Sequence, residues 1–382
     1  MRVTMRATAG DRNPPLSFVT VRTQFENAGD CVILRELIRL LSERGDVKID
    51  LGRHGTPQRF VDQVSSAAPA HRLLRAVKSI SAPMLMARLR GRRCFWFLVP
   101  GHKTLGSRPV SPLSECLRDL PLLLASACGV RICQLGASFD GLSTSELKAW
   151  TRRRRRLFLL SPRDSASAKY LESHGIRCDP CIPDLAFNLF VHAPPYHDRR
   201  AGPDRTVCIS FRSDQYAGQE DDAVAVTRAV WRSVSRDTRW TSVAQVARDV
   251  GAMESVLRRL QDSQVQVEPV LDLHADVESC LAFYRDVSLV VSNRLHVLLM
   301  AASQGARILA VAEGPGRAKL RGMLGDIGLE GAILDMHALD RLGGGVQVGL
   351  HVAGGAQRAR LHRALDAILS GRVPAEGELS HA

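Results

Sequence analysis

The chain has 382 residues, a length above that of most single domains, so we expect two domains. Hydrophobic residues make up 45% of it and charged residues 24%, a balance typical of globular proteins that excludes a disordered chain. The 52 basic and 39 acidic residues give a formal net charge of +13, which attracts anions, but aromatic residues are only 5%, too few for the stacking platforms of single-stranded nucleic-acid binders.

The first predicted elements are a strand and a helix joined by a short polar loop. Residues 17–21 are expected to form the strand, and leucine and isoleucine at helical spacing predict an amphipathic helix from Asp30 onward. The loop, Asn27-Ala28-Gly29-Asp30, then lies at a sheet edge, where Gly29 permits close backbone approach and Asp30 can cap the helix. Capping alone is the simpler interpretation of this loop.

The alternation continues through the first half of the chain. Residues 51–93 are basic and contain helical patches that the pattern does not place. A run of five arginines at 152–156 is most simply a solvated surface, with a phosphate- or membrane-binding role as the alternative. Strands are predicted at residues 94–99, 131–135 and 157–160, and helices at residues 113–127, 147–154 and 164–172.

A polar segment rich in proline and glycine, residues 192–205, is the best candidate for a linker. We therefore predict a flexible N-terminus at 1–15, an N-terminal α/β domain at 16–191, a C-terminal α/β domain at 206–371 and a flexible tail at 372–382. Strands that alternate with helices imply parallel sheets, so the fold class is α/β, with two doubly wound domains facing a cleft. No G-x-G-x-x-G follows the first strand and no P-loop is present, so a dinucleotide or Walker-type ATP site is not supported.

The stretch 286–329 reads as strand, turn, helix, strand, turn, helix. Arg294 and His296 lie where its first strand meets a helix, and Glu313 and Lys319 flank the second such junction. In an open α/β sheet this edge binds ligands, and an arginine, a histidine and a lysine suit an anion with a phosphate or carboxylate. The structural alternative is that Arg294 caps a helix or pairs with a surface acid, and that His296 is a core histidine whose hydrogen bonds are satisfied.

Several of these loops, taken in order from about residue 17 to 329, resemble the motifs of the polysaccharide pyruvyl transferases. The S-x-R-L-H match is the most specific, and the loop at 136–142 matches the family's G-Q-G-I-G-P-L only loosely. The matches, in chain order, are N-x-G-D at 27–30, S-x-R-D at 161–164 with Arg163 and Asp164, P-D-x-A-F at 183–187, an arginine at Arg212, S-x-R-L-H at 292–296 and a lysine at Lys319.

The resemblance implies a fold similar to the two-domain GT-B glycosyltransferases. It also implies transfer of the enolpyruvyl group of phosphoenolpyruvate onto two hydroxyls of a sugar, giving a cyclic ketal and phosphate in polysaccharide or glycoconjugate biosynthesis. The acceptor is then a sugar or a lipid-linked oligosaccharide, on the N-terminal side, and the donor lies on the C-terminal side. Phosphoenolpyruvate is the donor substrate, and neither a cofactor nor a metal is required.

This chemistry assigns roles to the candidate residues. Arg212, Arg294 and Lys319 supply the cations that hold a carboxylate and a phosphate. His296 is the candidate that protonates the vinyl carbon, because a histidine can do so near neutral pH. A sugar hydroxyl must lose a proton, and Asp30 or Asp184 could accept it or merely bind the sugar. The remaining candidate substrate contacts are Asn27, Gly29 and Glu313.

Two other functions fit the same residues. One is a GT-B-type glycosyltransferase that uses a nucleotide sugar, with Glu313 on the ribose and Arg294 and Lys319 on the diphosphate. The other is a basic binding protein without catalysis. No apolar run approaches the roughly 20 residues of a membrane span, no secretory signal is visible, and nine scattered cysteines are typical of reduced thiols. We expect a cytoplasmic protein, with peripheral attraction to anionic membranes and no nucleic-acid partner.

Overall fold

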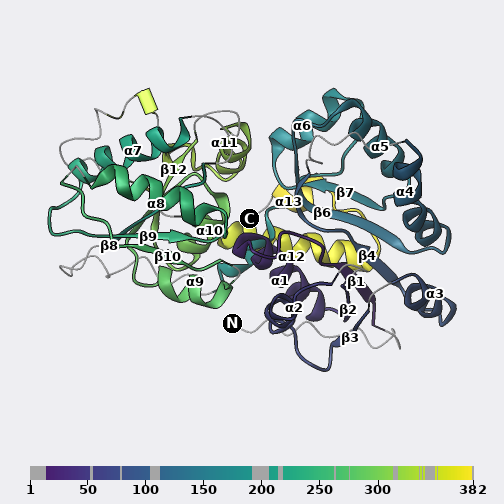
Figure 1. Cartoon of the computed structure of the whole chain (residues 1–382). Coiled ribbons are helices and arrows are strands. Elements are labelled where there is room, and N and C mark those ends of the chain that lie inside the picture. Colours follow the sequence, from purple (N-terminus) through teal and green to yellow (C-terminus); the bar gives the residue numbers. More distant parts are fainter. Residues whose placement is uncertain are drawn as a thin grey trace.

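The computed structural model shows two α/β domains side by side (Figure 1). The structure describes residues 14–51, 55–77, 80–103, 112–191, 206–213, 218–261, 264–274, 276–312, 317–334, 336–337, 339, 349–350 and 352–380. The predicted linker at 192–205 and most of the predicted flexible N-terminus lie outside these residues. Among the helices of this described part, none is both long and apolar enough to cross a membrane.

The first domain is built on a seven-stranded sheet in which all strand pairs are parallel. Its strands are β1 (Leu16–Thr20), β2 (Asp46–Asp50), β3 (Leu73–Val77), β4 (Cys94–Phe97), β5 (Gly101–Lys103), β6 (Arg131–Phe139) and β7 (Leu159–Pro162). They lie in the order β3-β2-β1-β4-β6-β5, with β7 also paired to β6. Chain order reverses between β1 and β4, so the carboxyl ends there form one of the crevices in which doubly wound sheets bind ligands.

Six α-helices and a 3-10 helix cover this sheet: α1 (Ala28–Ser42), α2 (Gln58–Ser65), α3 (Ser81–Leu89), α4 (Pro112–Ala127), α5 (Thr144–Arg154), α6 (Ser165–Ser173) and η1 (Leu185–Leu189). The first helix begins two residues earlier than predicted, because Asn27 caps it and not Asp30. The Asn27 side chain accepts a hydrogen bond from the Gly29 backbone N–H at 2.9 Å. Behind this cap, Leu34, Leu37 and the other apolar residues of α1 are fully buried.

Two segments of the first domain differ from the sequence-based prediction. β2 and β3 were not predicted, since their polar residues and short lengths give a weak strand pattern. The small-residue segment 136–139 was predicted as a loop, but it is the last part of β6. Gly136 has a φ of +66°, and the register of β6 against β7 shifts there, so the strand continues through a local irregularity.

The second domain has a six-stranded parallel sheet in the order β10-β9-β8-β11-β12-β13. Its strands are β8 (Thr206–Ser210), β9 (Arg239–Ala244), β10 (Val270–Asp272), β11 (Leu289–Ser292), β12 (Arg307–Val311) and β13 (Ile333–Leu334). Its helices are α7 (Gln219–Ser233), α8 (Asp249–Leu260), α9 (Val277–Tyr284), α10 (Leu295–Ser303), α11 (Arg317–Gly325) and the 3-10 helix η2 (Glu330–Ala332). The order reverses between β8 and β11, which creates the corresponding crevice of this domain.

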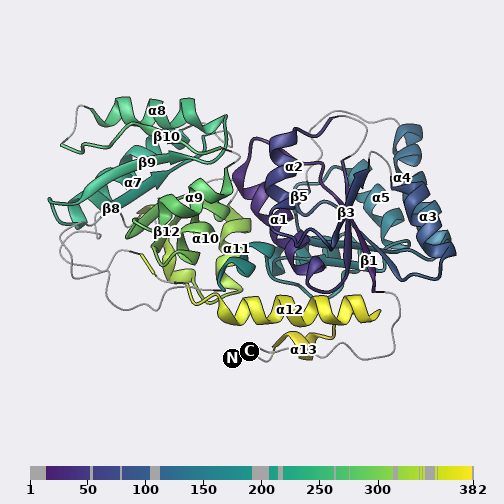
Figure 2. The same ribbon diagram turned by 90° about the horizontal axis from the view of Figure 1, so that it is seen from below.

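The last helices, α12 (Gly355–Ser370) and α13 (Glu376–Ser380), return to the first domain, and Figure 2 shows α12 running beneath it. Arg44 Nε donates to Asp366 Oδ1 at 2.7 Å, and Leu365 is fully buried. The predicted domain at 206–371 therefore includes a helix, α12, that packs against the first domain. An amphipathic pattern does not reveal which domain covers the apolar face of a helix. The predicted tail contains α13, whose Leu379 is buried.

The two domains contact each other directly. α1 packs against α9, η1 packs against α10, and α6 packs against α11. The loop before α1 also makes backbone contacts with the loop after β9: Ala28 N–H donates to the Gln245 carbonyl at 3.0 Å, and Asn27 forms an isolated antiparallel bridge with Val246. These contacts bring the two crevices to one shared space.

Candidate functional site

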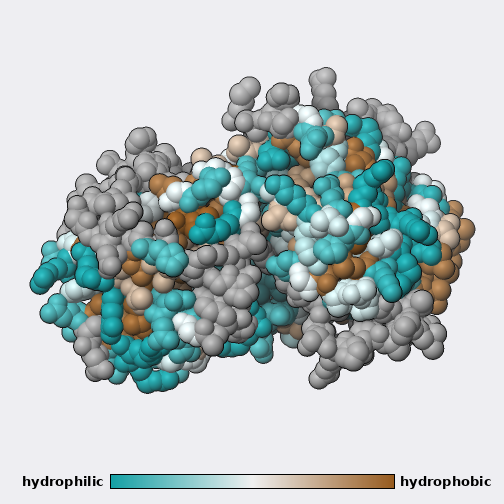
Figure 3. Space-filling view, turned by 90° about the horizontal axis from the view of Figure 1, so that it is seen from above, coloured by the Kyte–Doolittle hydropathy of each residue, from teal (hydrophilic) through white to brown (hydrophobic). Residues whose placement is uncertain are grey.

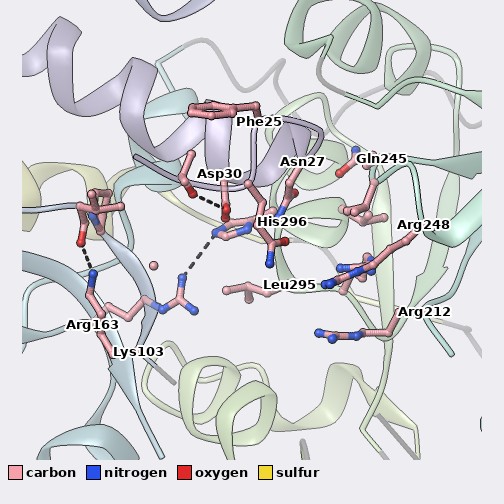
Figure 4. A pocket seen from close by; sticks show the side chains of 18 of the residues that line it. Phe25, Asn27, Asp30, Lys103, Arg163, Arg212, Gln245, Arg248, Leu295 and His296 are labelled. Carbon is pink, nitrogen blue, oxygen red and sulfur yellow. Dashed lines mark hydrogen bonds between the residues drawn. The ribbon is translucent and has the colours of Figure 1, made fainter. Parts of the chain in front are cut away.

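A cavity of about 960 Å³ lies between the domains, at the carboxyl ends of both sheets (Figure 4). Its charged and titratable lining residues lie at strand ends, in the loops that follow strands, or in the first turn of the next helix, as expected for doubly wound sheets. The first domain contributes Arg22, Asp30, Lys103, Asp140 and Arg163, and the second contributes Arg212, Arg248, Arg294 and His296. We call these two sets the first-domain wall and the second-domain wall.

Sequence reasoning identified only part of this lining. It selected Asp30, Arg212, Arg294 and His296, and the structure brings these four together. It did not select Arg22, Lys103, Asp140 or Arg248 as site residues, and it noted Arg163 only within a motif. The available signal was position: Lys103 ends β5, Asp140 and Arg163 follow β6 and β7 at once, and Arg22 and Arg248 lie two and four residues beyond β1 and β9.

His296 is carried by α10 but is surrounded by groups of the first domain. Its side chain is 16% exposed, and its Nε2 lies 3.5 Å from Asp184 Oδ2 and 3.4 Å from Arg163 Nη1. A Cβ added to Gly29 would lie 2.6 Å from His296 Nδ1, closer than such contacts allow. The close approach predicted at Gly29 is therefore the imidazole ring, and a larger residue there would displace it.

Asp184 lies behind His296 and is almost fully buried, so its contacts are protein groups. Arg163 Nη1 donates to its Oδ2 at 2.5 Å, and the Ala186 backbone N–H donates to its Oδ1 at 2.9 Å. Burial alone would raise the pKa of Asp184, but Arg163, His296 and the Ala186 N–H outweigh it and hold that pKa well below its usual range. An ionised carboxylate in this position orients the histidine.

Arg163 is itself fixed by the irregular end of β6. Its Nε donates to Ser138 Oγ at 2.6 Å, and Ser138 Oγ donates to Asp164 Oδ2 at 2.6 Å. Asp164 in turn caps α6 by accepting from the Ser167 backbone N–H at 2.7 Å. The segment that only loosely matched a family motif thus contributes Ser138, which holds Arg163 beside the histidine.

Arg294 and His296 both line the cavity although they are two residues apart at a helix start. Arg294 is the N-cap of α10 and has an extended backbone, with φ −109° and ψ 120°, so regular helical spacing does not separate them. Its guanidinium forms an ion pair with Asp249, a buried residue at the start of α8. Arg294 therefore does pair with an acid, but with a buried one beside the cavity and not with the surface acid of the structural alternative.

Arg212 is positioned through its backbone by a neighbouring strand end. The Arg212 N–H donates to Asn293 Oδ1 at 2.9 Å, and Asn293 Nδ2 donates to the Arg212 carbonyl at 3.0 Å. Asn293 therefore joins the loops after β8 and β11 at the crevice. Figure 4 shows Arg212 and Arg248 extending side by side into the cavity.

The first-domain wall has mixed charge. Asp30 accepts a hydrogen bond from Thr23 Oγ1 at 2.5 Å, and the Lys103 ammonium donates to the Val99 carbonyl. Burial lowers the pKa of Lys103 to about 8, an effect that nearby Asp30 opposes and Arg153 reinforces. Asn27 also lines the cavity, with its side-chain oxygen engaged in capping α1.

Two predicted contacts cannot be placed at this site. Glu313 lies outside the residues that the structure describes, and so does the side chain of Lys319, whose backbone belongs to α11. Within the described residues, no group of three or more histidine, cysteine, aspartate or glutamate side chains is arranged to hold a metal ion.

Comparison with known proteins gives a family and a fold. Residues 27–315 match the family model for polysaccharide pyruvyl transferase, and a search of curated proteins gave no match. Among solved structures, a UDP-N-acetylglucosamine 2-epimerase is similar at a TM-score of 0.55 and 11% identity, over 96% of this chain and 99% of that one. S. aureus MnaA in complex with UDP is similar at a TM-score of 0.53 and 10% identity, over 95% of this chain and 99% of that one. The Methanocaldococcus jannaschii UDP-GlcNAc 2-epimerase with UDP-GlcNAc and UDP is similar at a TM-score of 0.52 and 11% identity, over 94% of this chain and 100% of that one.

The structural similarity confirms the predicted GT-B-like pair of parallel-sheet domains. At such low identity it supports the fold alone. The family match covers most of the chain and includes the loop at 27–30, the arginine and aspartate after β7, and the residues around Arg294 and His296. The chain therefore belongs to the polysaccharide pyruvyl transferase family.

Proposed function

We propose that this protein transfers the enolpyruvyl group of phosphoenolpyruvate to two hydroxyls of a sugar, forming a cyclic ketal and releasing phosphate. The observation that carries this proposal is the convergence of Arg212, Arg248 and Arg294 beside a histidine that a buried Arg163–Asp184 ion pair orients. Family membership is consistent with the reaction type. Phosphoenolpyruvate acts as donor substrate, and the proposed reaction uses no cofactor.

The donor fits the second-domain wall by charge and geometry. Phosphoenolpyruvate carries a carboxylate and a phosphate on adjacent groups, so it needs several cations at one place. Arg212, Arg248 and Arg294 offer planar guanidinium groups that can bind either anion through paired hydrogen bonds. Asp249 fixes the Arg294 side chain, so that less freedom is lost when the donor binds.

His296 would then donate a proton to the methylene carbon of the donor. The double-bond electrons form the new C–H bond, and an oxocarbenium-like centre develops at C2, which the first sugar hydroxyl attacks as it loses its proton. Loss of phosphate and attack by the second hydroxyl complete the ketal. One hydroxyl proton replaces the proton given by His296, and the other leaves with phosphate.

The acceptor fits the first-domain wall. Asp30 and Asp140 present carboxylates to the cavity, and carboxylates accept hydrogen bonds from sugar hydroxyls. Asp30 is the group that would receive a hydroxyl proton, since Asp184 is held as a buried anion behind the histidine. The acceptor is a sugar or a lipid-linked oligosaccharide, and the reaction takes place in the cytoplasm.

The experiment that tests this proposal identifies the donor substrate. Purified protein is incubated with phosphoenolpyruvate and a panel of sugar acceptors, and phosphate release and the mass of each acceptor are followed. We expect phosphate release that depends on acceptor, together with a mass gain equal to one pyruvate ketal. A sugar nucleotide consumed in its place, with phosphoenolpyruvate left intact, would establish the glycosyltransferase alternative.

A further inference from the structure

The outer edge of the first domain carries exposed apolar side chains that the proposed reaction does not use. On α3, Leu85, Met86 and Leu89 are 45%, 48% and 73% exposed. Leu89 lies four residues after Leu85 and three after Met86, so it neighbours both of them on the helix surface and the three form a continuous strip. Figure 3 shows hydrophobic residues gathered at the end of the molecule where Figure 1 places α3 and α4.

The neighbouring helix α4 continues this strip. Leu120, Leu123 and Leu124 are 45%, 39% and 53% exposed and have the spacing i, i+3, i+4, which also places them on one side. α3 and α4 contact each other, and Arg88 of α3 donates to the Cys128 carbonyl just beyond the end of α4 at 3.1 Å. We call the six side chains of the two helices the apolar edge. A patch of this kind marks an interaction surface.

Basic side chains lie beside the apolar edge. Arg90 follows α3 and is exposed. The end of α5 carries the arginine run and lies against α4: Arg153 Nε donates to Asp119 Oδ1 at 2.6 Å, and Arg152 Nε lies 3.9 Å from Asp119 Oδ2. Arg152 is also 44% exposed, and Arg155 at the end of α5 is exposed.

The arginine run is therefore divided in function. Arg153 binds Asp119 and covers the Trp150 ring at 5.6 Å, and Arg154 binds Asp179. These two hold the domain together. Arg152, which lies within ion-pair distance of Asp119 and is partly exposed, and the exposed Arg155 form the basic border of the apolar edge. α4 also carries Glu115, whose side chain lies outside the described residues. Among the side chains of α3 and α4 that the structure describes, Asp119 is the single acid, and it pairs with Arg153 and Arg152.

We propose that the apolar edge is a docking surface for an anionic lipid bilayer. Exposed leucine and methionine side chains suit insertion among acyl chains, and arginines at their border suit negatively charged headgroups. A second copy of the chain is a poorer occupant, because a symmetric contact would bring two arginine borders together. The net charge of +13 adds to that repulsion and favours an anionic surface.

The proposal is tested with the full-length protein and vesicles in low salt. We expect the protein to co-sediment with phosphatidylcholine–phosphatidylglycerol vesicles and to stay in solution with phosphatidylcholine alone. The double variant Leu85→Ser/Leu89→Ser should lower the bound fraction at least about tenfold. The matched control Leu271→Ser, at a residue 42% exposed on β10, should bind like the wild type.

Charge is tested separately. Arg90→Gln/Arg155→Gln should weaken vesicle binding severalfold, whereas Arg232→Gln/Arg236→Gln, two exposed arginines of the second domain, should change it less. Equal binding by wild type and Leu85→Ser/Leu89→Ser, or no binding to anionic vesicles at low salt, would overturn the proposal. It would also be overturned if sedimentation showed a wild-type dimer that these leucine substitutions convert to a monomer, since the edge would then be an interface between copies.

Discussion

The two walls of the cavity differ in charge although they have the same origin at strand ends. The second-domain wall presents Arg212, Arg248 and Arg294, and the lining residues described on that side include no acid. The first-domain wall presents Asp30 and Asp140 together with its basic residues. A concentrated positive wall selects an anionic ligand, whereas a mixed wall suits a neutral ligand with many hydroxyls. Under the proposed reaction, this difference matches the donor to the second domain and the acceptor to the first.

The largest effect is expected where the walls meet, at His296. His296→Gln should lower turnover about 10²–10⁴-fold, the usual contribution of a general acid, because glutamine preserves polar contacts but supplies no proton. Phosphoenolpyruvate affinity should change only severalfold, since the arginines remain. Steady-state kinetics and calorimetry measure the two quantities. His274→Gln, at a half-buried histidine of the second domain that does not line the cavity, is the control. If His296→Gln retains more than about a tenth of wild-type turnover, the histidine is a binding or structural residue.

The second-domain wall is tested by its arginines. Arg212→Ala and Arg248→Ala should each weaken phosphoenolpyruvate binding by about 2–5 kcal/mol, the cost of removing one partner from a partly desolvated charge pair. Calorimetry on each variant measures this, with Arg232→Ala on α7 as the control. Arg294→Ala is a less direct test, because it also leaves Asp249 buried without its guanidinium and so destabilises the fold. If both Arg212→Ala and Arg248→Ala bound phosphoenolpyruvate with wild-type affinity, the donor would not bind to this wall.

The first-domain wall is tested at Asp30. Asp30→Asn should weaken acceptor binding or turnover by about 1.5–3 kcal/mol, the size of a hydrogen bond to a charged group, and leave phosphoenolpyruvate affinity nearly unchanged. Asp62→Asn, at an exposed aspartate of α2, is the matched control. Separate titrations of donor and acceptor distinguish the walls. A loss of donor affinity equal to that of Arg212→Ala would show that the two walls do not divide the substrates.

The smallest effect concerns Lys103 and is a stability effect. The folded-state pKa of about 8 lies below the ordinary value of 10.5, so the folded protein binds fewer protons than the unfolded chain between these values. Wild-type stability should therefore rise as the pH increases from about 8 towards 10.5. Lys103→Met removes this dependence, so it should raise the melting temperature most below pH 8, with a gain that shrinks as the pH rises. If the difference in melting temperature between Lys103→Met and the wild type did not change with pH, the Lys103 ammonium would not be destabilised by burial.

The sequence predicted the parallel strands and the loops of the site better than the packing around them. Strand-to-helix junctions at Arg212, Arg294 and His296 follow from local apolar patterns, because the carboxyl ends of parallel strands must share an edge. The contacts of His296 with Gly29 and Arg163 join residues more than a hundred positions apart, and no local pattern contains that information. The same holds for α12, whose amphipathic sequence suits either domain.

His296 belongs to the second domain, but Gly29, Arg163 and Asp184, which fix its ring, all belong to the first. Under the proposed reaction, the proton donor is therefore placed only while the domains are together. A molecule opened between α1 and α10 would still hold phosphoenolpyruvate on its arginines, but without an oriented acid. Such an arrangement would leave an energy-rich enol phosphate without its proton donor until the two domains are in contact.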